Sequence, residues 1–346
     1  MKLNVNLSPR LRQVLKWAGY VAFYLLALLV FAVLTFPYER LGDRIVQEFN
    51  SRQTGPKPMR LKLGHMSSYW LNGIEAEDIT FTSPGDTDEE GKLGKPKVLT
   101  VDSAHASVSL FRLLFGTVSL SFGADAFGGE LSGHTVNSDE GRSLELELDD
   151  LDLGQAPLFG DIVGLPLSGK LTGSIDLLMP EEKLSKADGK ITLKVTDLGA
   201  GDGKAKIRDT IALPKLEAGE LTLDAEAKAG VLKINTFAAN GPDLKLDSEG
   251  TLRLRDAFDS STLGLTISFK FQERYTNKSD ITKSLFGGGS MPGLFDLDPK
   301  MKRAKRADGS YGWRISGTLA RLNFMPAPVS GAADHSAKTP AAAATE

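Results

Sequence analysis

The stretch LSGKLTGSIDL, residues 167–177, alternates leucine, isoleucine or glycine with polar residues, and this alternation decides the fold. The stretch LGLTISFKF, residues 263–271, repeats the pattern. A period of two predicts a β-strand with one apolar and one solvated face, as is common in antiparallel sheets. Together the two stretches predict an apolar face that comprises Leu167, Leu171, Ile175, Leu177, Leu263, Leu265, Ile267, Phe269 and Phe271.

Similar alternation recurs over most of the chain after residue 59, including residues 144–148 and 190–195. Two acids, Asp149 and Asp150, break the phase before Leu151, as a β-bulge would. Helical spacing is scarce, and it predicts short helices near residues 38–50, 156–164 and 280–286. We therefore predict a mainly β protein: an antiparallel β-meander, folded as a curved sheet or a sandwich, with few short helices.

An uncharged run, WAGYVAFYLLALLVFAVLTF, occupies residues 17–36. As a helix it would be about 30 Å long, which matches the hydrocarbon core of a bilayer. The alternative is a cleaved signal peptide, but the run is longer than a typical signal core and no small-residue cleavage site follows it. We predict a transmembrane anchor whose membrane-facing residues include Trp17, Tyr20, Tyr24, Leu28, Phe31 and Phe36.

The charges that flank this run predict its orientation. The first sixteen residues carry four basic residues and no acid, whereas both signs follow the run. The positive-inside rule places the N-terminus in the cytoplasm and the bulk of the chain in the bacterial periplasm, as a single-pass inner-membrane protein. The predicted segments are a cytoplasmic segment 1–16, the transmembrane helix 17–36, periplasmic β-rich parts 37–140 and 141–325, and a disordered tail 326–346.

Composition excludes several kinds of chemistry. The 346 residues include no cysteine, which excludes disulfides, thiolate metal sites and a cysteine nucleophile. A formal net charge of −3 argues against a nucleic-acid partner. The histidines do not pair at a metal-ligand spacing; they are His65, His105, His134 and His335. We predict no catalytic residue, no cofactor and no metal, and hence a protein that is not an enzyme.

Two segments carry a family resemblance: TFPYERLGDRI at residues 35–45 and APLFGDIVGLPLSGKLTG at residues 156–173. With the basic N-terminus and the single apolar run, they resemble the long version of the type II secretion system protein N (GspN) family. More distantly, the chain is similar to AsmA-like envelope proteins. The GspN resemblance implies a non-enzymatic part of the secretion machine that contacts its inner-membrane platform or its outer-membrane secretin side.

The AsmA-like resemblance implies a second function, in which the apolar face holds membrane lipid. The alternating faces fit a packed core as well as a lipid-binding face, with the core favoured because open apolar faces of that size are unusual. The direct partner, the oligomeric state and the division of the periplasmic part into one or two domains stay open at this point.

Overall fold

A computed structural model describes residues 9–53, 58–85, 94, 96–156, 165–203, 206–207, 211–212, 214–288 and 291–327. The chain divides into two compact units, Met1–Asn137 and Ser138–Glu346. Each unit is built around antiparallel strands that follow one another in chain order.

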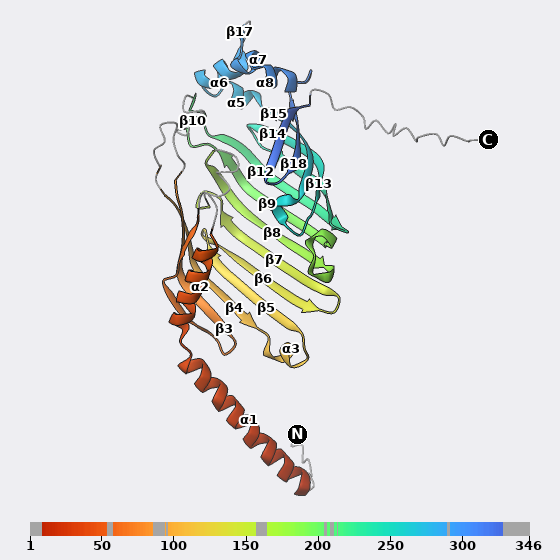
Figure 1. Cartoon of the computed structure of the whole chain (residues 1–346). Coiled ribbons are helices and arrows are strands. Elements are labelled where there is room, and N and C mark those ends of the chain that lie inside the picture. Colours follow the sequence, from red (N-terminus) through yellow and green to blue (C-terminus); the bar gives the residue numbers. More distant parts are fainter. Residues whose placement is uncertain are drawn as a thin grey trace, which may run out of the picture. The chain divides into compact units, whose positions relative to one another are not determined.

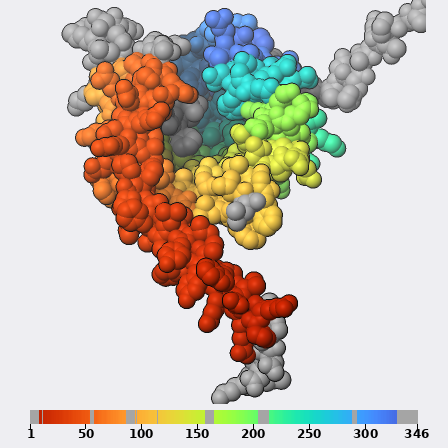
Figure 2. Space-filling view, turned by 60° about the horizontal axis from the view of Figure 1, so that its bottom comes forward, coloured from red at the N-terminus to blue at the C-terminus, as the bar shows by residue number. Residues whose placement is uncertain are grey.

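The N-terminal unit begins with helix α1 (Pro9–Thr35). Its segment Arg12–Thr35 has a mean hydropathy of 2.3 and is long and apolar enough to cross a membrane. The six predicted anchor residues, from Trp17 to Phe36, all have exposed side chains. Figure 2 shows α1 in red, projecting from the unit. A helix with apolar side chains on every side and no protein cover needs an apolar solvent, which supports a membrane anchor.

Helix α2 (Tyr38–Arg52) follows α1 after Pro37, which cannot donate a helical hydrogen bond. It confirms the helix predicted near residues 38–50. Its apolar side packs on the sheet: the Phe49 and Phe81 ring centroids lie 5.8 Å apart. At the far end of α2, the Asn50 side chain donates to the Leu61 carbonyl oxygen at 3.1 Å and accepts from the Leu61 N–H at 2.8 Å.

The strands of the N-terminal unit are β1 (Arg60–Lys62), β2 (His65–Tyr69), β3 (Gly73–Ser83), β4 (Lys97–Val108), β5 (Val118–Ala126) and β6 (Gly129–Ser138). Their order is β1-β3-β4-β5-β6, and β2 pairs with β3 beside β1. A short helix, α3 (Leu110–Leu114), connects β4 to β5.

The C-terminal unit carries the longer meander, in the order β7-β8-β9-β12-β13-β14-β15-β18-β19. These strands are β7 (Gly141–Asp152), β8 (Leu167–Met179), β9 (Asp188–Ala200), β12 (Leu216–Lys228), β13 (Val231–Asn240), β14 (Leu244–Arg253), β15 (Thr262–Phe271), β18 (Tyr311–Thr318) and β19 (Arg321–Pro326). The pairing of β7 with β8 shifts between Leu148 and Leu151, and Asp150 has a φ of 53°. The predicted bulge is therefore confirmed.

The fold confirms a mainly β, antiparallel meander. Of the two predicted arrangements, the described strands adopt the open sheet rather than a sandwich: apart from the two-stranded pairs β10–β11 (Lys206–Ile207 with Ile211–Ala212) and β16–β17 (Gly287–Gly288 with Met291–Pro292), each unit has one layer. Alternation gives each strand a single apolar face, and no second layer of strands covers that face among the described residues.

Short helices of the C-terminal unit lie between β15 and β18 and gather at one end of its strands (Figure 1). They are α5 (Glu273–Thr276), α6 (Asp280–Phe286), α7 (Leu294–Leu297) and α8 (Pro299–Ala304); the 3-10 turns are η1 (Pro180–Glu182), η2 (Leu184–Lys186) and η3 (Phe258–Ser260). Helix α6 confirms the prediction for residues 280–286. The helix predicted at 156–164 lies outside the described residues, apart from Ala156. In the tail predicted to be disordered from residue 326, Pro326 is the last residue of β19, and residues 328–346 lie outside the described residues.

Candidate functional site: an apolar sheet face

The strand register of the C-terminal unit places the predicted apolar residues on one face. Ile175 of β8 lies opposite Leu146 of β7 and Ile191 of β9. We call the resulting line of partners the Ile175 row. It crosses all nine strands as Leu146, Ile175, Ile191, Ala225, Ile234, Gly250, Leu265, Ile315 and Phe324.

A second line, the Leu193 row, lies two residues away along each strand, or three on β13, where a bulge shifts the register. Here Leu193 of β9 lies opposite Gly173 of β8 and Leu223 of β12. This row runs through Leu148, Gly173, Leu193, Leu223, Phe237, Ser248, Ile267, Trp313 and Pro326. Seventeen of the eighteen positions in the two rows are apolar or glycine, and Ser248 is the exception. The face is thus continuous across the sheet.

The opposite face of the same strands is polar and charged. Lys190 of β9 forms an ion pair with Asp224 of β12 at 3.1 Å, and Lys194 forms one with Glu220 at 2.8 Å. These are exposed cross-strand pairs, which contribute little to stability but keep that face in water. The apolar face alone is left as a candidate binding surface.

The two rows are incompletely covered. Of the nine predicted face residues, Leu171 and Leu265 are buried and the other seven are half-buried. In the Leu193 row, every side chain larger than glycine has intermediate exposure. Leu171 belongs to a small core with Leu151, Leu153 and Val195, and Leu148, Leu167 and Leu193 pack against it. In the Ile175 row, Ala225 and Leu265 are buried. Most other side chains of the two rows keep partial exposure, so the described residues cover the rows only in part.

The same face is closed at one end, beyond Phe269. We define the closed end as the aromatic cluster that joins β15 and β18 to the helices α5–α7. In it, the Phe271 ring centroid lies 4.7 Å from that of Phe286 and 5.7 Å from that of Tyr275. Its members are Phe269, Phe271, Tyr275, Phe286, Phe295 and Tyr311.

A buried carboxylate supports the closed end. Asp243 is fully buried, and its Oδ2 accepts from the Glu217 N–H and from Lys278 Nζ, both at 3.0 Å. Arg274 Nε lies 3.5 Å from Oδ1 of the same carboxylate. Burial raises the pKa of Tyr275 to about 12, and the negative charge of Asp243 adds to this effect. The short helices are thus fastened to the sheet by aromatic packing and by charge.

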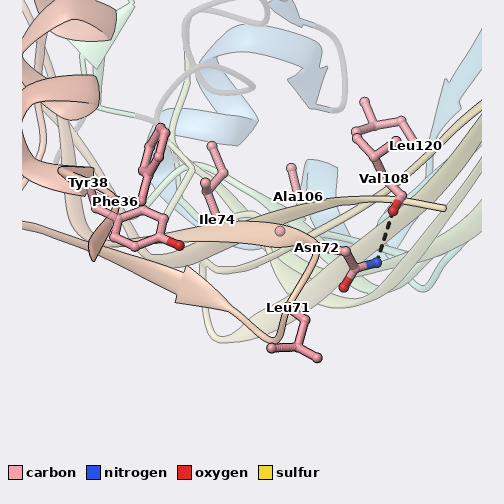
Figure 3. Close-up of a pocket in the computed structure, with 9 residues that line it drawn as sticks. Phe36, Tyr38, Leu71, Asn72, Ile74, Ala106, Val108 and Leu120 are labelled. Atoms are coloured by element: carbon pink, nitrogen blue, oxygen red, sulfur yellow. Dashed lines mark hydrogen bonds between the residues drawn. The ribbon is translucent and has the colours of Figure 1, made fainter. Parts of the chain in front are cut away.

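A separate cavity lies within the N-terminal unit, just after α1 (Figure 3). Its volume is about 340 Å³. Asn72 Nδ2 donates to the Val108 carbonyl oxygen at 2.9 Å and ties β4 to the β2–β3 turn at its rim. The lining is largely apolar: Phe36, Tyr38, Leu71, Asn72, Gly73, Ile74, Ala106, Val108 and Leu120.

The histidines do not form a reactive centre in the described part of the chain. The His134 Nδ1 lies 3.0 Å from Ser121 Oγ, and its Nε2 lies 3.3 Å from Ser119 Oγ and 3.4 Å from an Arg112 nitrogen. A Ser-His-acid triad needs a carboxylate to orient the ring, and among the described residues its ring partners are hydroxyls and a guanidinium. The His105 ring stacks on Tyr69 at 4.2 Å. No group of three metal-ligating side chains occurs among the described residues, which exclude His335.

Comparisons with known proteins add no relative: no protein-family model, no curated protein and no solved structure matches this chain. The resemblance to type II secretion protein N therefore remains a prediction that rests on residues 35–45 and 156–173.

Sequence alternation found the apolar face but missed two features. The closed end depends on Phe286 and Phe295. The sequence predicted the helix that ends at Phe286, but not α7 or the packing of both rings at the sheet. The cavity joins residues near positions 36, 72 and 108, and no local pattern connects them.

Proposed function

We propose that this chain is a membrane-anchored, non-enzymatic module that binds the acyl chains of membrane lipids on the apolar face of its C-terminal unit. The observation that carries the proposal is that the two rows are only partly covered. Partly exposed leucine and isoleucine side chains on a continuous face are stabilised when an apolar ligand removes them from water. Each methylene group removed from water contributes about 0.8 kcal/mol.

The dimensions of the rows suit an acyl chain. Nine strands about 4.8 Å apart give a row of about 38 Å, longer than the roughly 30 Å hydrocarbon core that two opposed acyl chains fill. The polar opposite face, with pairs such as Lys190 and Asp224, keeps the sheet in water while the apolar face is occupied.

The charge asymmetry around α1 supports the same function. The basic residues before the helix favour a cytoplasmic N-terminus, so both sheets would lie on the exported side, in a bacterium the periplasm. An apolar face tethered beside the bilayer has lipid as its most abundant apolar ligand. This placement predicts a lipid as partner and requires no nucleic acid and no cofactor.

A photocrosslinking experiment tests the proposal on the full-length chain in its native membrane. A benzophenone side chain replaces Leu193, on the apolar face, or Lys194, the exposed neighbour on the polar face of the same strand. We expect a lipid adduct, detected by mass spectrometry of the purified chain, at position 193 and not at position 194. Equal labelling at both positions, or none at position 193, would contradict lipid binding on this face.

A second candidate function is a contact role in the type II secretion machine, and the outermost strand β19 favours it. In the strand order of the C-terminal unit, β19 follows β18 and ends the path. Its Phe324 and Met325 side chains are exposed. A free edge can accept a strand from a partner, such as the inner-membrane platform or the secretin side.

If this function holds, deleting the chain will impair secretion of folded proteins and a crosslinker at Met325 will capture a secretion component. Normal secretion in the deletion strain would exclude it.

A further inference from the structure

Large apolar side chains are exposed at one end of the N-terminal unit. Trp70 has 78% of its surface exposed, Phe111 has 72% and Phe115 has 74%. Other exposed apolar residues are close to them in the sequence. We call this set the loop patch: Trp70, Leu71, Leu110, Phe111, Leu113, Phe115 and Val118.

The strand pairing brings these residues to the same end of the sheet. Trp70 and Leu71 lie in the β2–β3 turn, and the others lie in or beside α3, between β4 and β5 (Figure 1). The Val108 N–H donates to the Asn72 carbonyl oxygen at 3.0 Å, and the Ser109 N–H donates to the Ser119 carbonyl oxygen at 2.9 Å. Residues some forty positions apart therefore form one surface.

The loop patch carries little charge. Residues 70–72 and 109–119 contain no acid and a single charge, Arg112. The opposite end of β3 and β4, where Ser83 pairs with Lys97, lies away from the patch. The patch is thus apolar and faintly basic.

The exit of α1 lies at the apolar end. The cavity of Figure 3 is lined by Phe36 and Tyr38 together with Leu71, Val108 and Leu120. Phe36 directly follows the last residue of α1, so Leu71 of the loop patch is held beside the point where the apolar helix ends. Phe36 and Tyr38 themselves pack ring to ring at 4.9 Å.

We propose that the loop patch inserts into the interface of the bilayer that α1 spans, as a second point of membrane attachment. Tryptophan and phenylalanine side chains beside a cationic group favour the headgroup region, and a negatively charged lipid surface would attract Arg112. The exposed aromatic residues gain apolar surroundings there without any protein partner. This inference rests on α1 as a membrane anchor and is independent of acyl-chain binding by the C-terminal unit.

The absence of native cysteine makes a site-directed spin-label test clean. Single-cysteine variants of the full chain, Phe111→Cys and Trp70→Cys, are labelled and reconstituted in vesicles of phosphatidylethanolamine and phosphatidylglycerol. Val98→Cys is the matched control, because Val98 is an exposed apolar residue at the start of β4, the end of that strand away from the loop patch. Leu28→Cys, in the middle of α1, reports the bilayer core. The measurement is the ratio of collision with oxygen, which enriches in lipid, to collision with a water-soluble nickel complex.

We expect labels at positions 111 and 70 to give ratios several-fold above that at position 98 and closer to that at position 28. Ratios at 111 and 70 equal to that at 98 would overturn the proposal, whether the patch is then free in water or covered by a protein. A water-like ratio at position 28 would contradict the anchor and the proposal with it. Circular dichroism of each labelled variant verifies that the sheet is folded.

Discussion

The closed end and the Leu193 row belong to the same apolar face of one sheet, yet the chain treats them differently. At the closed end, Phe271 and Tyr275 pack against Phe286 of α6, and the buried Asp243 forms an ion pair with Lys278. Side chains along the Leu193 row are partly exposed, as are Phe271 and Phe286. The difference is in packing: among the described residues, no aromatic ring from a helix packs against the Leu193 row.

The difference indicates what the open part of the face is for. The chain covers one end of its apolar face with the short helices α5–α7 but not the rows. Partly exposed leucine and isoleucine side chains along nine strands invite aggregation unless a ligand or a membrane component occupies them. The contrast between the two regions is therefore the physical basis of the proposed lipid binding.

The largest effect is expected from removing the buried charge at the closed end. Asp243→Ala removes the fully buried acceptor of the Glu217 N–H and of the partly exposed Lys278. The lost charge-assisted hydrogen bond and the backbone N–H left unpaired together cost about 3 kcal/mol or more. We expect a loss of that size in the free energy of unfolding of the full chain, measured with denaturant in detergent micelles. Asp247→Ala, an exposed acid on the polar face of β14, is the control and should change stability by less than about 0.5 kcal/mol.

Truncation of side chains compares the two regions directly. Phe271→Ala at the closed end should cost about 3 kcal/mol, because the larger side chain loses its ring contacts with Tyr275, Phe286 and Tyr311. Leu193→Ala should cost about 1 kcal/mol, because a smaller, partly exposed side chain loses less buried apolar surface. Denaturant unfolding of both variants in detergent measures the difference. Equal costs would mean that the Leu193 row is as tightly packed as the closed end, and the contrast would fail.

A smaller effect separates the regions by pH. Because the pKa of Tyr275 is raised to about 12 in the folded chain, the neutral phenol stabilises the closed end fully below the ordinary tyrosine pKa of about 10. This contribution is lost as the pH rises from about 10 through about 12. Burial also raises the pKa of Tyr311, so tyrosinate absorbance should show late-titrating groups, one of which is missing in Tyr275→Phe. A Tyr275 signal that titrates with the exposed tyrosines would show that the closed end is open to water.

Much of the fold could be read from the sequence, because alternation is a local property of each strand. Residues 167–177 and 263–271 determine which side chains face together, and the two acids Asp149 and Asp150 mark the bulge. The extent of cover over that face is a tertiary property. It depends on where Phe286 of α6 and Phe295 of α7 pack in the folded chain, and the periodicity of the strands does not determine this. The cavity beside α1 was unpredictable for the same reason.

The central claim is tested most directly by a benzophenone scan of residues 190, 191, 193 and 194 of β9 in the native membrane. Ile191 and Leu193 lie on the apolar face, and Lys190 and Lys194 lie on the polar face of the same strand. The account predicts that lipid adducts follow this two-residue period, with strong labelling at 191 and 193 and background at 190 and 194. Labelling without that period, or protein adducts in place of lipid at 191 and 193, would contradict it.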